Sequence, residues 1–146
     1  MRARGMDPES ICQAERDEML TLEADELCRR VKEVFSGVTL GDGVGLFEGQ
    51  AIDDYETDEV RREKRESDEV ESWDQIKAED LNRCYSSLCF FDAAGMRFHL
   101  PAFLIADLNG DYEMGMEFTL THWSDYTKNQ FALLNRDQRR VVREYL

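Results

Sequence analysis

The chain is poor in the residues that interrupt or cross-link a fold, and it has no long apolar run. It contains two prolines, four cysteines and two histidines among 146 residues. It has 18 basic and 32 acidic residues. No run of about 18 apolar residues is present, so we expect no membrane-spanning helix. The first ten residues, MRARGMDPES, lack the apolar centre of a secretory signal. This pattern favours a cytoplasmic protein whose cysteines are reduced.

The shortage of basic residues gives the chain a net charge of −14, and the charge is uneven. Residues 1–80 carry 24 acidic and 11 basic side chains, whereas residues 81–146 carry 8 and 7. A field of this sign repels phosphate backbones and anionic lipid surfaces. We therefore expect no nucleic acid and no membrane as partner, and any charged partner should be a basic protein.

A length of 146 residues is typical of one domain and buries roughly 70% of the unfolded surface. We therefore assign residues 1–146 to one domain, with residues 1–6 expected to be disordered. Residues 53–72, DDYETDEVRREKRESDEVES, offer only three apolar side chains. We expect this segment to be a solvated helix or a partly ordered, mobile linker.

The densest apolar stretch is Cys84 to Leu108, CYSSLCFFDAAGMRFHLPAFLIADL. Its first part is rich in β-formers, and 96–100 alternates apolar with polar residues, which predicts two strands. Asp92 and Gly95 are typical of a turn between them, with Gly95 at positive φ. Pro101 would then begin a short helix. With a third predicted strand at 116–121, the sequence indicates an α+β fold in which helices cover a small antiparallel sheet.

Helical spacing predicts the covering elements. Apolar residues recur at helical intervals from Leu20 to Phe35, and 46–52 has the character of one or two helical turns. A final helix is predicted over 136–146, where Asn135 and Gln138 have the spacing of a capping box.

The motifs of common catalytic and metal sites are missing. No GxSxG, phosphate-binding loop or dinucleotide fingerprint occurs, and neither cysteines nor histidines have zinc spacing. Residues 107–111, DLNGD, begin like a calcium loop, but Tyr112 and Phe118 stand where glycine and glutamate are required. We therefore expect no cofactor, no metal and no assigned catalytic residue.

Polar residues of the predicted hairpin form one candidate site. Arg97 and His99 would share the polar face of the second strand, with Asp92 in the turn, as an anion site or an acid–base pair. An ordinary exposed strand face is the favoured interpretation. The candidate binding residues are Asp53, Asp54, Trp73, Asp92, Arg97 and His99.

Four arginines follow one side of the predicted last helix: Arg136, Arg139, Arg140 and Arg143. Their position near a helix C-terminus is favourable, and they can pair with the acidic half of the chain. A binding stripe is the less favoured alternative.

Three pieces of the sequence carry a resemblance: Trp73-x-x-Ile76, the run FFDAAGMRFHLPA and the terminal FALLNRDQRRVVREYL. Over roughly residues 27–146 the chain resembles a family of small bacterial proteins of unknown function. The resemblance implies neither an activity nor site residues. The tail is also similar to the ends of some bacterial toxin-immunity and related interaction domains, an analogy only.

Two functional hypotheses remain open. The first is a non-enzymatic binding module, of an immunity-like or adaptor kind, for a basic partner. The alternative is a small enzyme with a polar site near the 88–100 hairpin. A broad acidic face would favour the first, and a deep pocket with perturbed pKa values would favour the second.

Overall fold

A computed structural model of the chain describes residues 8–122 and 124–146. Every regular element in this described part is a helix. The elements are, in chain order, α1 Pro8–Val34, α2 Leu46–Asp53, α3 Asp58–Glu66, η1 Trp73–Gln75, α4 Ala78–Arg83, η2 Tyr85–Cys89, α5 Ala93–Leu108, α6 Glu117–Thr121, α7 Asp125–Gln130 and α8 Arg136–Tyr145. The expectation of disorder for residues 1–6 falls outside the described residues.

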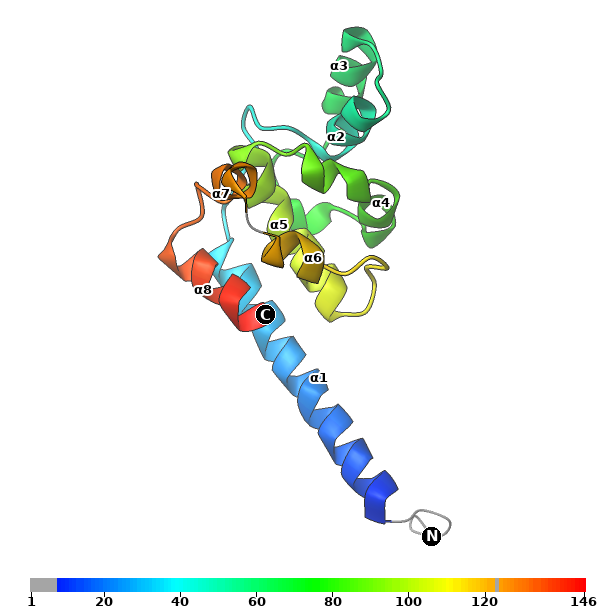
Figure 1. The fold of residues 1–146 in the computed structure, drawn as a ribbon, viewed down its shortest axis with the longest axis vertical. Helices are drawn as coiled ribbons and strands as arrows, with labels where there is room; N and C mark the ends of the chain where they lie inside the picture. The colour runs from blue at the N-terminus through cyan, green and yellow to red at the C-terminus, as the bar shows by residue number, and fades with distance from the viewer. Residues whose placement is uncertain (1–7, 123) are drawn as a thin grey trace.

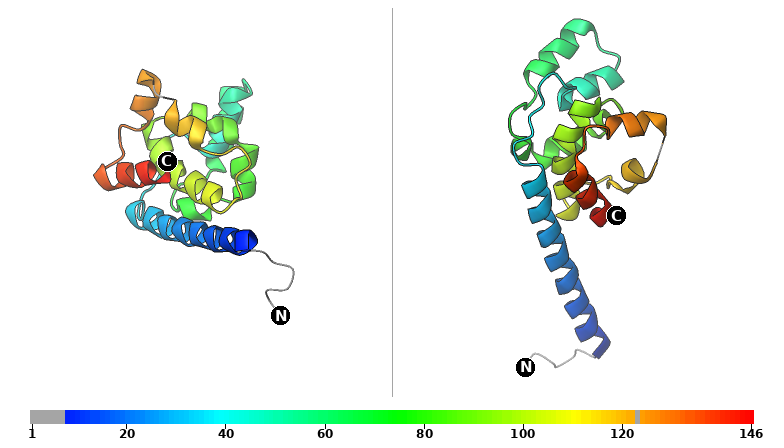
Figure 2. Two further views of the ribbon diagram at one scale, coloured as in Figure 1. Left: turned by 60° about the horizontal axis from the view of Figure 1, so that its bottom comes forward. Right: turned by 90° about the vertical axis from the view of Figure 1, so that its left-hand side faces the viewer.

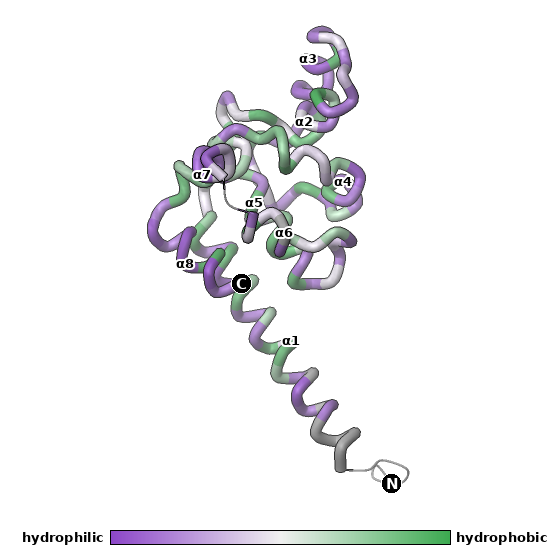
Figure 3. The backbone as a smooth tube through the Cα atoms, viewed as in Figure 1, coloured by the Kyte–Doolittle hydropathy of each residue, from purple (hydrophilic) through white to green (hydrophobic). Residues whose placement is uncertain are grey.

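Helices α1, α4 and α7 pack around α5, while the N-terminal part of α1 and the α2–α3 pair project from this body in opposite directions (Figure 1). The C-terminal part of α1 packs against α5 and α8, while its N-terminal part extends away from the body. The pair α2 and α3 projects from the other end, and the further views in Figure 2 keep this arrangement. In Figure 3 hydrophilic residues predominate along α3, which buries none of its residues.

The predicted antiparallel sheet is wrong, and with it the α+β class. Residues 85–89 form the 3-10 helix η2, and the supposed second strand and short helix are one continuous helix, α5. Asp92 is the N-cap of α5, where its carboxylate accepts a hydrogen bond from the Gly95 N–H at 2.8 Å. Gly95 is therefore the third residue of a helix, and its φ is not positive. Pro101 lies inside the helix instead of beginning one.

The physical reason is burial on all sides of α5. Helices α1, α4 and α7 and the 3-10 helix η1 all pack against it. Ten of its sixteen residues are buried, so the helix has no polar stripe from which a helical period could be recognised. The third predicted strand is wrong as well, because 117–121 forms the short helix α6.

The helices predicted outside this stretch are confirmed. The spacing of Leu20 to Phe35 belongs to α1, in which Leu27 and Val31 are buried. The short helix at 46–52 is α2. In α8 the Asn135 side chain accepts from the Gln138 N–H at 2.8 Å, and the Gln138 side chain accepts from the Asn135 N–H at 2.9 Å, which is the predicted capping box.

Three cysteines, Cys28, Cys84 and Cys89, are free thiols, and the side chain of Cys12 lies outside the described part. Within residues 8–122 and 124–146, no helix combines the length and apolar character required to cross a membrane.

Candidate functional site

The turn between α2 and α3 carries the densest unbalanced charge in the chain. Residues 53–59, here called the acidic tip, contain five carboxylates and no basic residue: Asp53, Asp54, Glu56, Asp58 and Glu59. Four of the five side chains are exposed, and that of Asp53 is half-buried. Because the α2–α3 pair projects from the body, these charges lie at one end of the molecule (Figure 1).

The tip is a compact turn with defined backbone geometry. The Tyr55 N–H donates to the Ile52 carbonyl at 3.1 Å, and the Glu56 N–H donates to the Ala51 carbonyl at 3.0 Å. These two bonds form a Schellman motif, which places Tyr55 at the position that glycine usually occupies. Tyr55 accordingly has φ +57°, the one positive φ among the described non-glycine residues.

The left-handed conformation at position 55 closes the end of α2, but the Tyr55 side chain gains no packing from it. A left-handed φ costs an L-residue about 1–2 kcal/mol, and a bulky residue adopts it rarely. The Tyr55 side chain is 93% exposed, so packing against its own protein does not offset the strain. The helix end therefore accounts for the backbone conformation, whereas no packing accounts for tyrosine in place of glycine.

Local bonds fix the start of α3 and leave most tip carboxylates available. The Thr57 hydroxyl accepts from the Val60 N–H at 3.3 Å, and the Arg61 guanidinium donates to the Glu56 carbonyl at 3.0 Å. The Asp58 carboxylate lies 3.7 Å from the same guanidinium. Within the described residues, the side chains of Asp53, Glu56 and Glu59 have no ion-pair partner.

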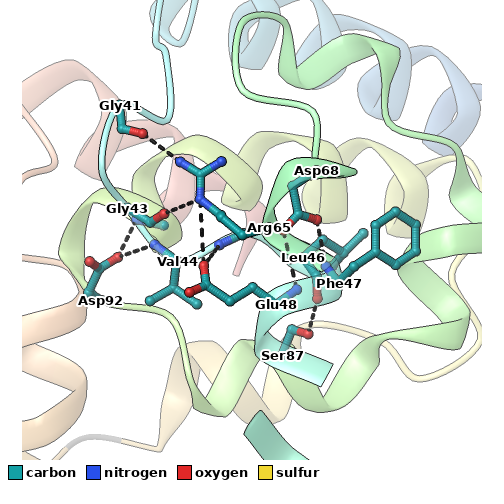
Figure 4. Close-up of polar contacts among 12 residues, drawn as sticks. Gly41, Gly43, Val44, Leu46, Phe47, Glu48, Arg65, Asp68, Ser87 and Asp92 are labelled. Atoms are coloured by element: carbon teal, nitrogen blue, oxygen red, sulfur yellow. Dashed lines mark hydrogen bonds and ion pairs between the residues drawn. The ribbon is translucent and has the colours of Figure 1, made fainter. Parts of the chain in front are cut away.

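A network of buried and half-buried polar groups attaches the α2–α3 pair to the body (Figure 4). The Arg65 guanidinium, near the end of α3, donates to the carbonyls of Gly41 at 2.6 Å and Gly43 at 3.2 Å. It also lies 3.6 Å from the Glu48 carboxylate of α2. The Ser87 hydroxyl of η2 donates to the Leu46 carbonyl at 2.6 Å. The end of α3 is thus bonded to the 41–45 loop, and the start of α2 is bonded to η2.

Asp68 is the buried member of this network, with 8% of its surface exposed. Its carboxylate accepts from the Phe47 N–H at 2.6 Å and from the Glu48 N–H at 3.2 Å, which satisfies the free donors at the start of α2. Burial raises the pKa of Asp68 to about 6, although the two N–H groups and Arg65 act in the opposite direction. Gly45 packs directly on this carboxylate and leaves no space for a Cβ atom.

The predicted site residues fall in three separate places. Asp53 and Asp54 belong to the acidic tip. Trp73 is 6% exposed, and its indole N–H donates to the Phe35 carbonyl at 3.0 Å, which joins η1 to the end of α1. Asp92 caps α5 and also accepts from the Val44 N–H at 3.0 Å.

Arg97 and His99 do not share a face, because two residues on a helix are turned about 200° from each other. Arg97 is half-buried, whereas His99 is completely buried. The His99 imidazole stacks on Phe91 with ring centroids 4.3 Å apart, and its Nδ1 lies 2.7 Å from the Gly95 carbonyl. With 0% of its surface exposed, His99 offers no accessible face to a substrate in this structure.

The shifted pKa values of two buried groups, His99 and Asp68, lead us to expect a specific pH dependence of the free energy of unfolding. Burial lowers the pKa of His99 from 6.5 to about 4, so its contribution to the free energy of unfolding is complete above pH 6.5 and is lost as the pH falls through 4. Asp68 has the opposite sign: its raised pKa contributes stability below pH 3.8 that is lost as the pH rises through 6. Between pH 4 and 6 the two contributions oppose each other.

We therefore expect single variants to separate the two contributions. Relative to the native chain, Asp68→Asn should lose stability more steeply as the pH falls from 6 to 4, and His99→Phe should lose it less steeply or gain. Urea denaturation of the three proteins at pH 4, 5, 6 and 7 measures this difference. Three parallel profiles would show that neither group titrates differently in the folded state.

Sequence reasoning missed Tyr55, Arg65 and Asp68. In the sequence, Tyr55 is one of three apolar residues within 53–72. Only the turn geometry shows that it occupies a position that usually requires glycine. Asp68 resembled its charged neighbours, and no local pattern distinguishes a buried carboxylate from an exposed one. Among the described residues, no three His, Cys, Asp or Glu side chains gather in a way that could hold a metal ion.

Over the described residues, fold and site together define an all-helical protein whose acidic hairpin is attached to the body by hydrogen bonds. The chain belongs to a family of unknown function, DUF6714, whose model matches residues 23–146. No curated protein and no solved structure matches the chain. The match begins within α1, so the N-terminal part of that helix lies outside the family region.

Proposed function

We propose that the protein is a non-enzymatic binding module that offers the acidic tip, residues 53–59, to a basic protein partner. The observation that carries this proposal is Tyr55, an aromatic side chain that is 93% exposed and conformationally strained in the middle of five carboxylates. Exposed tyrosines are enriched among the residues that dominate binding energy at interfaces. The surrounding carboxylates would steer a cationic surface toward it.

The attachment of the hairpin supports the same proposal. A binding surface held in one conformation loses less entropy on association than a flexible one. The bonds of Arg65 and Asp68 hold α2 and α3 against the body and make no direct bond to a tip side chain. The free thiols Cys28, Cys84 and Cys89 favour a cytoplasmic setting for this partner. Holding the tip in one conformation is part of this proposal, and the mobility of residues 53–72 that the sequence predicts is its alternative.

Neutralising the tip should separate binding from folding. A variant with Asp53, Asp54 and Asp58 changed to Asn, and Glu56 and Glu59 to Gln, is expected to keep its melting temperature within a few degrees. Exposed side chains of this kind contribute little to stability. Proteins captured from a cell extract by the immobilised native chain should be basic, should elute with salt, and should be lost with this variant.

The matched control changes five exposed carboxylates elsewhere and has the same net charge. It replaces Glu71, Asp74, Glu79, Asp111 and Glu113 with the corresponding amides. If the tip is the binding surface, the control retains the basic proteins that the tip variant loses. Equal losses from both variants would show that capture depends on net charge alone, and equal retention would remove the tip as a binding surface.

A further inference from the structure

A cavity of about 370 Å³ lies between α6, the turn that follows α7, and α8. Its floor is made by Leu120, Phe131 and Leu134, each of which is at most 6% exposed. Val142 of α8 forms part of the wall. The floor of the cavity is therefore apolar. No residue of the acidic hairpin is among those that line the cavity.

Two arginines of α8 stand at this cavity, on the same helical face as Val142. Arg139, Val142 and Arg143 follow the i, i+3, i+4 spacing that places side chains side by side on a helix. The Arg139 guanidinium donates to the carbonyls of Phe131 at 2.8 Å and Leu134 at 3.0 Å, which holds it against the turn. Two of its five N–H groups are used in these bonds, so it retains donors for a further acceptor.

Arg143 has no counter-ion among the described residues. In that part of the chain it forms no ion pair or hydrogen bond, although the protein carries 32 acidic residues. Arg136 and Arg140 are also without a described partner, and with Arg143 they line an adjoining hollow that includes Asp137 and Glu144. Placement near a helix C-terminus explains one favourable charge. It does not explain why an unpaired guanidinium borders an apolar cavity.

We propose that this cavity binds an amphipathic anion: one unbranched hydrocarbon chain that ends in a carboxylate or phosphate group. The chain would lie on the floor of Leu120, Phe131 and Leu134, and the anionic head would meet Arg143 and the free N–H groups of Arg139. Arginine recognises planar oxyanions with paired hydrogen bonds, and the adjacent apolar floor rewards burial of the chain. At about 370 Å³ the cavity is at the small end of ligand sites. It therefore suits a single chain better than a two-chain lipid.

The site is independent of the proposed partner of the acidic tip, because it uses other elements and ligands of opposite charge. Calorimetric titration with decanoate below its micelle concentration tests it directly. We expect saturable binding of one decanoate per chain. Decyltrimethylammonium, which has a tail of the same length and a cationic head, should not bind.

Arg143→Gln should weaken decanoate binding about tenfold or more, because loss of one charge-assisted contact corresponds to at least that factor. Arg140→Gln is the matched control: it removes the same charge from the same helix but does not line the cavity. Val142→Trp, which fills the cavity, should abolish binding, and an unchanged circular dichroism spectrum shows that each variant is folded.

The source of the anion is decided by a parallel arm with phosphatidylglycerol vesicles. Binding of free decanoate without vesicle binding assigns the site to a soluble ligand; vesicle binding that Arg143→Gln removes shows that one chain of a two-chain lipid enters the cavity. Failure of decanoate to saturate the native chain, or equal weakening by Arg140→Gln and Arg143→Gln, would overturn the proposal.

Discussion

Replacing Gly95 with alanine is expected to lower the free energy of unfolding by about 2–3 kcal/mol, as overpacking of a rigid contact does. The same change at an open helical position would raise stability by up to about 1 kcal/mol, because alanine favours helix more than glycine. At Gly95 an added Cβ atom would lie 2.6 Å from the Val44 carbonyl oxygen and 3.0 Å from an Asp92 carboxylate oxygen. Backbone cannot yield as a flexible side chain does, so the 43–45 loop would have to move away from α5.

Urea denaturation of Gly95→Ala and the native chain measures this effect. Ala93→Gly, at the first residue of α5, is the control for helix propensity alone and should cost no more than about 1 kcal/mol. An alanine at position 95 that leaves stability equal or higher would show that the loop does not pack against the start of α5.

Replacing Asp68 with alanine is expected to cost about 2–4 kcal/mol at pH 7. The substitution leaves the N–H groups of Phe47 and Glu48 without their acceptor, and a hydrogen bond to a charged group is worth about 1.5–3 kcal/mol. Removal of a carboxylate whose burial raises its pKa to about 6 offsets part of this loss. Amide exchange at residues 47–49 should accelerate in the variant, because α2 would lose its N-terminal acceptor.

The control is Asp54→Ala, which removes an exposed carboxylate from the other end of α2 and should change stability by less than about 0.5 kcal/mol. If Asp68→Ala were as stable as Asp54→Ala, Asp68 would not attach the hairpin. The proposal that the acidic tip is held in one conformation would then lose its structural basis.

The sequence indicated the type of secondary structure correctly where an element has one polar face. It was misleading where an element is buried on every side. In α8, the polar face and the capping box of Asn135 and Gln138 identify a helix without ambiguity. In α5, Met96, Phe98 and Leu100 imitate the alternation of a strand, but His99 between them is buried as well. Alternation in a segment that is buried on every side carries no information about its period.

The exposed acidic surface could be located from the sequence for a similar reason, whereas its role as a site stays a prediction. Composition indicated an acidic surface around Asp53 and Asp54, because exposed charge is visible in sequence. The roles of Trp73, Asp92 and His99 depend on contacts with residues far along the chain: the Phe35 carbonyl, the Val44 N–H and the Phe91 ring. Spacing within one segment cannot reveal such contacts. Tyr55 likewise becomes notable only through its positive φ and its exposure.

The strain at Tyr55 makes a single substitution the most direct test of the acidic tip. Tyr55→Gly relieves the left-handed conformation, and we expect it to raise the free energy of unfolding by about 0.5–1 kcal/mol, after the greater freedom of glycine in the unfolded chain is counted. If Tyr55 is retained for partner contact, the same variant must lose affinity for the basic proteins that the native chain captures.

The variant Tyr55→Asn provides the comparison, since asparagine tolerates positive φ and lacks the aromatic ring. It should bind as weakly as Tyr55→Gly. The decisive experiment therefore measures both the free energy of unfolding and the affinity for the captured partner, for the native chain and for these two variants. The account predicts that stability rises while affinity falls at least tenfold, the usual loss at a dominant interface residue. Undiminished affinity in the more stable Tyr55→Gly protein would contradict it.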